Sequence, residues 1–242
     1  MEAHERILVA IDTADTKAAT SLAQRVAGVV GGIKLGLEFF NATGPEGVRA
    51  VVAGKPLFLD LKYHDIPNTV AGAVRSVVRA CRPSILNVHA AGGRAMMQAA
   101  VAANQETADA IGITPPSLIA VTVLTSLDDA DLDSIGQYRP IGDQVVRLAR
   151  LAQEAGCDGA VCSPREITAI RAACGDGFQL VVPGIRPTSS AADDQKRTLT
   201  PAEAVAAGAD YLVIGRPITQ APDPVAAATA IADEIRASSA AA

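Results

Sequence analysis

The 242-residue sequence has few aromatic side chains: Phe, Tyr and Trp make up 3% of it, and Trp is absent. Hydrophobic residues still account for 49%, so small aliphatic side chains must pack any core. No apolar run reaches the ~20 residues needed to span a bilayer. The polar start, Met1–Arg6, lacks the apolar segment of a signal peptide. We therefore expect a soluble, cytoplasmic protein without a membrane partner.

Cysteine and histidine are also scarce. The four cysteines and three histidines form neither a C-x-x-C pair nor a cluster with zinc spacing, which favours reduced, mostly buried thiols. A Gly-x-Gly-x-x-Gly turn after a strand and a Walker loop are both missing, so no dinucleotide or ATP site is indicated. The net charge of -5, without a basic stripe, argues against nucleic acid as a partner. We expect no cofactor.

Apolar runs alternate with amphipathic segments along the whole chain. Eight runs are continuously apolar, as in parallel strands that are buried on both faces. Eight strand–helix repeats predict an α/β protein with a single (β/α)8 TIM barrel over residues 1–242, close to the usual size of about 250 residues. The expected strands cover residues 7–12, 33–37, 57–62, 84–89, 118–124, 158–162, 179–183 and 209–216.

The third of these runs, within Pro56–Asp65, ends in charge. Asp60 and Lys62 have the same parity, so they point the same way if the strand persists, and Asp65 follows at a turn. A rim ion pair worth ~0–1 kcal/mol is the ordinary alternative. Because the charges end an apolar strand, we favour a network in which two carboxylates keep Lys62 protonated. Such a lysine can deliver a proton or stabilise a developing anion.

Polar side chains end the other expected strands as well. Barrels of this class carry their chemistry at the carboxyl ends of the strands. His89 has no acidic neighbour in sequence, and we expect it to be a structural hydrogen-bonding residue. The residues expected to converge at this end are Asp12, Lys34, Asp60, Lys62, His89, Thr125, Ser126, Pro183, Arg186, Gly215 and Arg216.

Two of these residues suggest an anion site. Gly215 and Arg216 follow the eighth run, where barrels commonly bind phosphate, and Arg offers a fork of charged donors. A Gly-Arg turn with a solvated Arg is the alternative. The polar loop 184–200, with Arg186 and Gln195, could close over the phosphate. Asp60 and Asp65 could hold Mg²⁺, but the neighbouring lysines compete as cations, so we expect no metal.

With these residues identified, the chain resembles the orotidine 5'-phosphate decarboxylases. The stretch 58–69, FLDLKYHDIPNT, matches the family pattern Asp-x-Lys-x-x-Asp-Ile-Pro-x-Thr. Further matches are residues 87–93, 120–126, 182–186, 194–195 and 213–216. The resemblance implies decarboxylation of orotidine 5'-monophosphate to UMP, the last step of de novo pyrimidine nucleotide synthesis. It also implies a homodimer that needs neither metal nor cofactor.

The resemblance further implies a role for each matching residue. Lys62 would protonate C6 of the pyrimidine, Asp60 would lie near the leaving carboxylate, and Asp65 would reach the site of the other subunit. Lys34 and Asp12 would contact the ribose and support the charge array. The remaining substrate contacts would come from Thr69, Thr125, Ser126, Pro183, Arg186, Gln195, Gly215 and Arg216, with the phosphate held by Gln195, Gly215 and Arg216.

Three other functions stay open at this point. A Mg²⁺-dependent sugar-phosphate decarboxylase or lyase on the same barrel would share the Asp-x-Lys-x-x-Asp pattern, but it would want an acid where Lys34 stands. A non-catalytic nucleotide-binding protein would not need Lys62 between two acids. A Schiff-base lyase would need a neutral Lys62, whereas two carboxylates raise the pKa of an amine.

Overall fold

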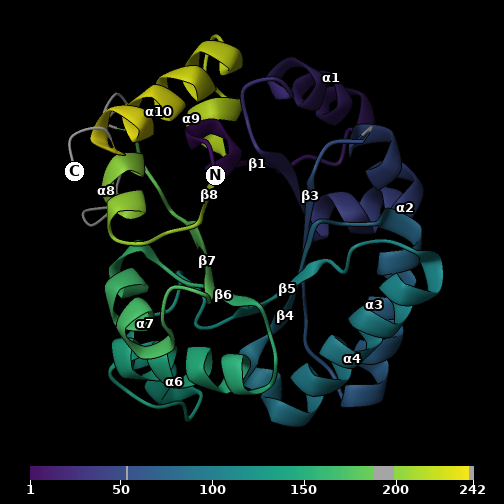
Figure 1. The fold of residues 1–242 in the computed structure, drawn as a ribbon, viewed down its shortest axis with the longest axis vertical. Helices are drawn as coiled ribbons and strands as arrows, with labels where there is room; N and C mark the ends of the chain where they lie inside the picture. Colours follow the sequence, from purple (N-terminus) through teal and green to yellow (C-terminus); the bar gives the residue numbers. More distant parts are fainter. Residues whose placement is uncertain (53, 188–198, 240–242) are drawn as a thin grey trace. The chain divides into compact units, whose positions relative to one another are not determined.

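The structure, a computed structural model, describes residues 1–52, 54–187 and 199–239. Its eight strands form one closed parallel barrel in the order β1 to β8, with helices between them (Figure 1). This confirms the predicted (β/α)8 fold. The strands are β1 (Ile7–Ile11), β2 (Gly32–Gly36), β3 (Leu57–Tyr63), β4 (Ile85–His89), β5 (Ser117–Val121), β6 (Gly159–Val161), β7 (Gln179–Pro183) and β8 (Tyr211–Ile214).

Ten α-helices and three short 3-10 turns are found in the described residues. The α-helices are α1 (Thr16–Val26), α2 (Leu37–Val52), α3 (Pro67–Cys81), α4 (Gly93–Ile111), α5 (Asp129–Ser134), α6 (Ile141–Glu154), α7 (Ile167–Cys174), α8 (Pro201–Ala206), α9 (Arg216–Thr219) and α10 (Pro224–Ser239). The 3-10 turns are η1 (Ala3–Arg6), η2 (Ala90–Gly92) and η3 (Pro164–Glu166).

The chain divides into two compact units. The first combines residues 1–60 with residues 182–242, and the second is residues 61–181. The boundary falls inside β3, so Asp60 belongs to the first unit and Lys62 to the second. The expectation of a single domain over residues 1–242 stays a prediction.

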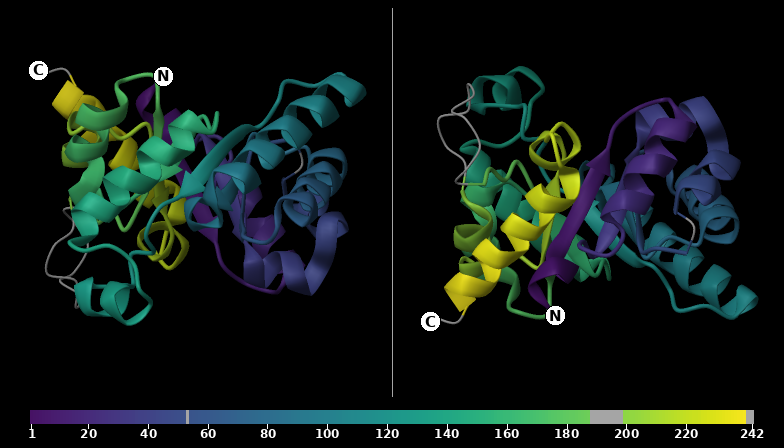
Figure 2. Two further views of the ribbon diagram at one scale, coloured as in Figure 1. Left: turned by 90° about the horizontal axis from the view of Figure 1, so that it is seen from below. Right: turned by 90° about the horizontal axis from the view of Figure 1, so that it is seen from above.

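In the first unit, β1 pairs with both β2 and β8, and β2 pairs with β3. All five residues of β1 are buried, as expected for a strand covered on both faces. Helix α10 contacts η1, α1, α8 and α9. The first and last elements of the chain therefore pack together, and Figure 2 shows η1 and β1 (purple) beside α10 (yellow).

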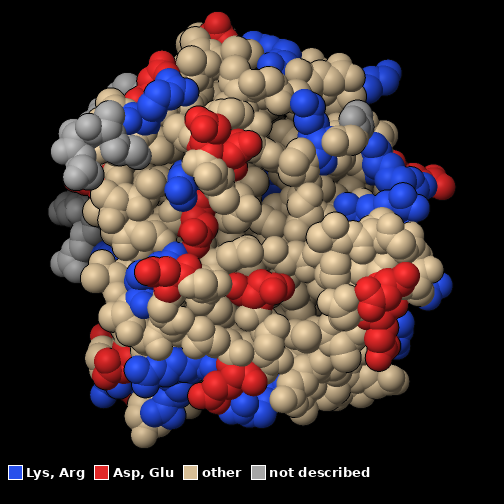
Figure 3. Space-filling model, viewed as in Figure 1, with Lys and Arg blue, Asp and Glu red and all other residues tan. Residues whose placement is uncertain are grey.

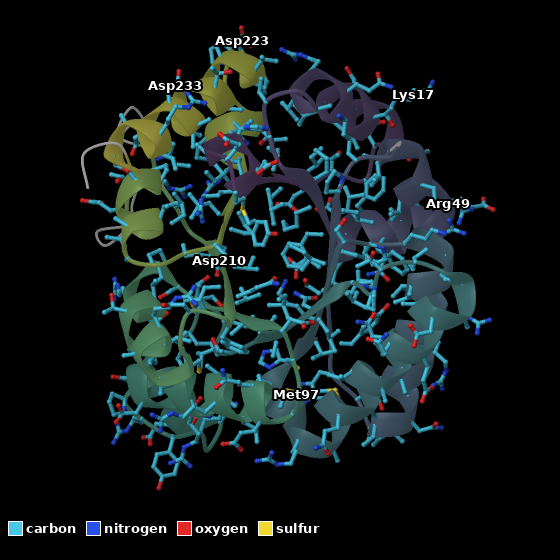
Figure 4. All side chains as sticks on the ribbon, viewed as in Figure 1. Lys17, Arg49, Met97, Asp210, Asp223 and Asp233 are labelled. Atoms are coloured by element: carbon cyan, nitrogen blue, oxygen red, sulfur yellow. The ribbon has the colours of Figure 1, made fainter. Side chains whose placement is uncertain are left out.

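In the second unit, β4, β5, β6 and β7 pair in sequence. Helix α3 packs along α4, and α6 packs against α7. The close pairing of β6 with β7 requires Gly159, because a Cβ there would lie 2.1 Å from the Gln179 carbonyl oxygen. Met96 and Met97 of α4 are 1% and 0% exposed, and Figure 4 labels Met97. Because the protein has few aromatic side chains, these flexible methionines fill core space that the smaller Ala and Val side chains cannot fill alone.

Local sequence explains where several helices begin and end. Asp15 caps α1, because its Oδ1 accepts the N–H groups of Lys17 at 2.8 Å and Ala18 at 3.2 Å. Asp223, labelled in Figure 4, precedes α10 and accepts the N–H groups of Val225 and Ala226 in the same way. Helix α4 ends at Gly112, whose φ of 66° is the left-handed conformation that glycine adopts without strain.

Two strands differ from the expected bounds by two residues or more at one or both ends, and the other bounds agree to within one residue. The fifth strand was expected over residues 118–124, but β5 ends at Val121, and a turn closed by the Leu127 N–H on the Leu124 carbonyl oxygen (3.0 Å) follows. The apolar run continues past the strand because Thr122 and Val123 are still buried there. The eighth strand is also shorter than expected, over residues 211–214 instead of 209–216.

No helix in the described residues is both long enough and apolar enough to cross a membrane.

Replacing Met97 by Ala should lower the free energy of unfolding by about 2–5 kcal/mol, because it removes a fully buried side chain and leaves a cavity. Urea unfolding followed by circular dichroism measures this. The matched control is Gln98→Ala on the exposed face of the same helix, which should change stability by no more than about 0.5 kcal/mol. Equal losses for the two variants would contradict the assignment of Met97 to the core.

Candidate functional site

A lysine held between two carboxylates forms the centre of the site residues in the first unit. The Lys34 ammonium lies 3.2 Å from Asp12 Oδ1 and 3.5 Å from Asp60 Oδ2. The side chains of Lys34 and Asp60 are 10% and 13% exposed, whereas that of Asp12 is 62% exposed. An ammonium so far removed from water is stable only with charged partners, which the two carboxylates supply. Three of the residues expected at the strand ends are therefore brought together.

Strand register explains how these groups meet. Ala10 lies opposite Lys34 in the β1–β2 pair, and Gly36 lies opposite Asp60 in the β2–β3 pair. Asp12 follows directly on β1, and the long Lys34 side chain extends toward both acids. A Cβ on Gly36 would lie 3.5 Å from Lys34 Nζ, so a larger side chain would fill the space beside the ammonium. Gly36 was missed in the sequence, although a glycine that ends a strand between two charged strands is a usable signal.

Lys62, in the second unit, has an unusual backbone. Its φ is 50°, in the left-handed region that a non-glycine residue rarely adopts, although β3 runs on to Tyr63. The strand therefore persists as expected, but simple alternation of side chains does not apply at Lys62. Conformations of this kind cost of order 1–3 kcal/mol and concentrate at functional sites. The Lys62 N–H donates to Asn87 Oδ1 at 2.8 Å, and Asn87 is 0% exposed on β4.

His89 lies two residues beyond Asn87 on β4 and stacks on His64, with ring centroids 5.4 Å apart and an interplanar angle of 21°. Its Nδ1 accepts the Ala91 N–H at 3.4 Å. Burial lowers the pKa of His89, and the neighbouring His64 and Lys62 charges lower it further. His89 is thus neutral near pH 7, and its contacts are those of the structural histidine that the sequence predicted.

Asp65 and Thr69 lie around the start of α3. Asp65 is exposed, and its Oδ1 accepts the Ile66 N–H at 2.6 Å. Pro67 then occupies the first helical position, where a missing N–H costs nothing. Thr69 is exposed in the first turn of the helix. Ile66, between these polar groups, is 66% exposed, which is unusual for a large aliphatic side chain.

Thr125 and Ser126 occupy the centre of the turn 124–127, three residues or more beyond β5, and both are exposed. The sequence placed them at the end of the fifth strand, so the structure moves them from a strand end into a loop. The segment before them is anchored, because Thr122 Oγ1 donates to the Val161 carbonyl oxygen at 2.8 Å.

The expected phosphate residues lie in the first unit, at the end of β7 and after β8. Pro183 ends β7, and the Arg186 N–H donates to the Leu199 carbonyl oxygen at 3.2 Å, which joins the two described ends of the 184–200 loop. Gly215 and Arg216 follow β8 directly, and Arg216 is exposed. Gln195 lies outside the described residues.

The thiols of Cys157 and Cys162 and the Tyr63 phenol stay protonated near neutral pH. Burial, with a smaller contribution from Cys81, raises the pKa of Tyr63 to about 12. Burial beside Asp158 raises the pKa of Cys157 to about 12, and burial also raises that of Cys162. The four cysteines are reduced thiols, and three of them are buried, as the sequence indicated. With raised pKa values, Cys157 and Cys162 are poor nucleophiles at neutral pH.

Acidic and basic side chains are intermixed on the face that Figure 3 shows. The described residues contain no group of three or more His, Cys, Asp or Glu side chains close enough to hold a metal ion. The charged groups described above can instead fix an ammonium between anions. Such an arrangement suits proton delivery to, or stabilisation of, a carbanion.

Comparison with known proteins gives one family. The profile of the "Orotidine 5'-phosphate decarboxylase / HUMPS family" matches residues 5–231. A curated relative named orotidine 5'-phosphate decarboxylase, from Paramagnetospirillum magneticum, is 58% identical over 230 residues, which cover 95% of this chain and 97% of the relative. A second, of the same name and from Rhodospirillum rubrum, is 59% identical over 95% of this chain and 93% of its own length.

A solved structure gives the same result in three dimensions. The crystal structure of orotidine 5'-phosphate decarboxylase from Lactobacillus acidophilus superimposes with a TM-score of 0.83 at 35% identity. The match covers 95% of this chain and 98% of that one.

The lowered pKa of His89 predicts a pH-dependent stability. Above the ordinary value of 6.5, His89 is neutral in both folded and unfolded chains. As the pH falls below it, the unfolded chain binds a proton that the folded protein resists, so stability is lost down to the folded-state pKa. His89→Asn keeps an acceptor for the Ala91 N–H but does not titrate. Between about pH 8 and pH 5, the variant should lose less unfolding free energy than the parent.

Urea unfolding at several pH values measures this difference. His4→Asn, in η1, is the control and should follow the parent protein. Identical pH slopes for the parent and His89→Asn would contradict the neutral, half-buried state of His89.

Proposed function

Because the chain belongs to the orotidine 5'-phosphate decarboxylase / HUMPS family, we propose that it converts orotidine 5'-monophosphate to UMP and CO2. This is the last step of de novo pyrimidine nucleotide synthesis, and we propose that the protein carries it out in the cytoplasm. The observation that carries the proposal is the buried Lys34 ammonium, which lies between the carboxylates of Asp12 and Asp60. Asp60 stands two residues before Lys62 on β3. A fixed set of alternating charges is what a reaction through a carbanion requires.

The chemistry assigns the central role to Lys62. Breaking the bond between C6 and the carboxylate releases CO2 and leaves an electron pair on C6. That carbanion has little resonance stabilisation, so a nearby ammonium lowers its energy electrostatically. Lys62 then donates one proton from Nζ to C6, which gives UMP, and recovers a proton from water.

The carboxylates and Lys34 set the charge state of this site. In this proposal, Asp60 and Asp65 supply negative charge on either side of the Lys62 ammonium. Asp60 also lies near the substrate carboxylate, so the loss of CO2 relieves a repulsion between two anions. Lys34 keeps Asp60 ionised and, with Asp12, contacts the ribose hydroxyl groups. The two short contacts of Lys34 support this division of roles.

The remaining residues bind the parts of the substrate that do not react. Gly215, Arg216 and Gln195 hold the phosphate, with Arg186 and Pro183 in the loop beside it. Thr125 and Ser126 contact the base and ribose, and Thr69 completes the set. Binding energy from the distant phosphate can be used to orient the reacting ring. The exposed Arg216 directly after β8 supports this assignment.

We further propose a homodimer in which Asp65 enters the site of the partner subunit. Asp65 is exposed at the start of α3, beside Ile66, which is 66% exposed. An exposed aliphatic side chain next to a carboxylate of the catalytic motif suits a surface that a second copy covers.

The reaction as proposed needs no metal or cofactor. Lys34 neutralises the carboxylates of Asp12 and Asp60 that a cation would otherwise occupy. The Lys34 ammonium supplies a fixed positive charge, but unlike a metal ion it has no coordination sites that exchange ligands.

The first test mixes EDTA-treated protein with orotidine 5'-monophosphate and follows the ultraviolet absorbance. Decay to the UMP spectrum is expected. Absence of decay from folded protein would overturn the proposal and favour a Mg²⁺-dependent sugar-phosphate enzyme or a binding-only protein.

Lys62→Ala should lower kcat by at least about 10⁴-fold, because both the proton donor and the electrostatic stabilisation are lost. The matched control is Lys55→Ala, an exposed lysine just before the amino end of the same strand, which should keep the parent rate. Near-native turnover by Lys62→Ala would refute the role of this lysine.

Arg216→Ala should weaken binding of the nucleotide far more than binding of the nucleoside. We expect KM for orotidine 5'-monophosphate to rise by more than about 10-fold, since a charge-assisted pair is worth ~1.5–3 kcal/mol. The kcat/KM for orotidine, which lacks the phosphate, should change little. Arg25→Ala, at the exposed end of α1, serves as the control. Equal losses for both substrates would exclude the phosphate role.

A further inference from the structure

The backbone of Lys62 needs a restraint that β3 alone does not supply. A φ of 50° is energetically unfavourable for a lysine, whereas an extended conformation would continue the strand without strain. Strained residues persist only where the surrounding structure holds them. The restraint must therefore come from groups that contact residues 62–64.

Asn87 on β4 provides one such contact. Its Oδ1 accepts the Lys62 N–H at 2.8 Å, and the residue is 0% exposed. Its neighbours in β4, Leu86 and Val88, are both fully buried and apolar. A polar amide at this position is costly unless its hydrogen bonds are made, so the side chain is held firmly in one orientation.

The same strand contacts the chain again two residues further on. Asn87 and His89 have the same parity in β4, so both face the same way. Asn87 bonds to the backbone of Lys62, and the His89 ring stacks on His64. Strand β4 thus contacts the chain at Lys62 itself and again at His64, two residues further on.

Orientation of a lysine depends strongly on its backbone angle. The ammonium sits at the end of a flexible four-carbon stem, so a change of φ from left-handed to extended moves it by far more than 1 Å. A displacement of about 1 Å in a catalytic group can cost about 10²-fold in rate. An acceptor that fixes the Lys62 backbone therefore acts on the position of the proton donor.

We propose that Asn87 is a positioning residue for Lys62, which holds the left-handed backbone of the proton donor through a side-chain hydrogen bond to its N–H. This inference rests on the proposed function, because it takes Lys62 as the group that acts at C6. Asn87 itself contacts no reacting atom in this proposal.

A second buried asparagine provides a control that distinguishes an effect on the position of Lys62 from a general loss of stability. Asn104, on α4 of the same unit, is 5% exposed, and its Nδ2 donates to the Pro116 carbonyl oxygen at 2.7 Å. Loss of this amide removes a buried hydrogen bond that has no connection with Lys62. Asn104→Ala should therefore destabilise the protein but leave kcat within about twofold.

The experiment compares Asn87→Ala, Asn87→Asp and Asn104→Ala by kcat, KM, affinity for UMP and amide hydrogen exchange at residue 62. Asn87→Ala should lower kcat by about 10–100-fold and leave the Kd for UMP within about threefold, because the phosphate and ribose contacts are unchanged. Exchange of the Lys62 amide should accelerate in this variant only. Asn87→Asp keeps an acceptor oxygen at the same place and should recover part of kcat and of the amide protection.

Unchanged kcat in folded Asn87→Ala would overturn the inference, as would a kcat loss in Asn104→Ala of the same size. If Asn87→Ala does not fold, Asn87→Ser replaces it, since the shorter hydroxyl group falls short of the Lys62 N–H. Failure of the proposed function is recognised separately, by absence of turnover in the parent protein or by full turnover in Lys62→Ala.

Discussion

A buried ammonium must have anions beside it, and this constraint governs the first unit. Lys34 is nine-tenths removed from solvent in the middle of an apolar strand. The free-energy cost of such burial is offset only when carboxylates stand within ion-pair distance. Asp12, directly after β1, and Asp60, on β3, occupy those positions. Because β1, β2 and β3 pair in parallel and in register, the carboxylates of Asp12 and Asp60 both reach the Lys34 ammonium on β2.

A similar rule for hydrogen bonds governs the second unit. Asn87 is fully buried, and the Lys62 N–H lies where the backbone of β3 departs from extended dihedral angles. Their mutual bond satisfies a buried acceptor and a backbone donor that would otherwise be costly. The local strain at Lys62 is thus coupled to the packing of β4. A hydrogen bond to a buried side chain restrains the backbone of Lys62.

The core shows how such positions are kept rigid without large aromatic side chains. Strands are filled by Val, Ile, Leu and Ala, and α4 contributes two buried methionines. The β-branched side chains of Val and Ile have few χ1 rotamers, and a close-packed interior has low compressibility, so the strands that carry the charged residues are held in place. Exposed segments such as the Thr125–Ser126 turn come after the strands and have neither helical nor strand conformation.

The sequence by itself determined the fold class and predicted most of the charged residues of the candidate site. Eight continuous apolar runs specify a parallel barrel, because only strands that are covered on both faces lack polar alternation. Asp12, Lys34, Asp60 and Lys62 could be identified because charge at the end of an apolar run is conspicuous. Boundaries were less certain: Val123 is apolar and buried but lies beyond β5, since burial and strand pairing are separate properties.

Only the tertiary structure decided which of these residues meet and how they are held. Sequence spacing cannot reveal that Lys34 reaches two acids, because that depends on the register of three strands. It cannot reveal the left-handed φ of Lys62 or its bond to Asn87, which lies 25 residues away along the chain. Backbone strain of this kind has no local sequence signature in a lysine, since it is imposed by a neighbouring strand.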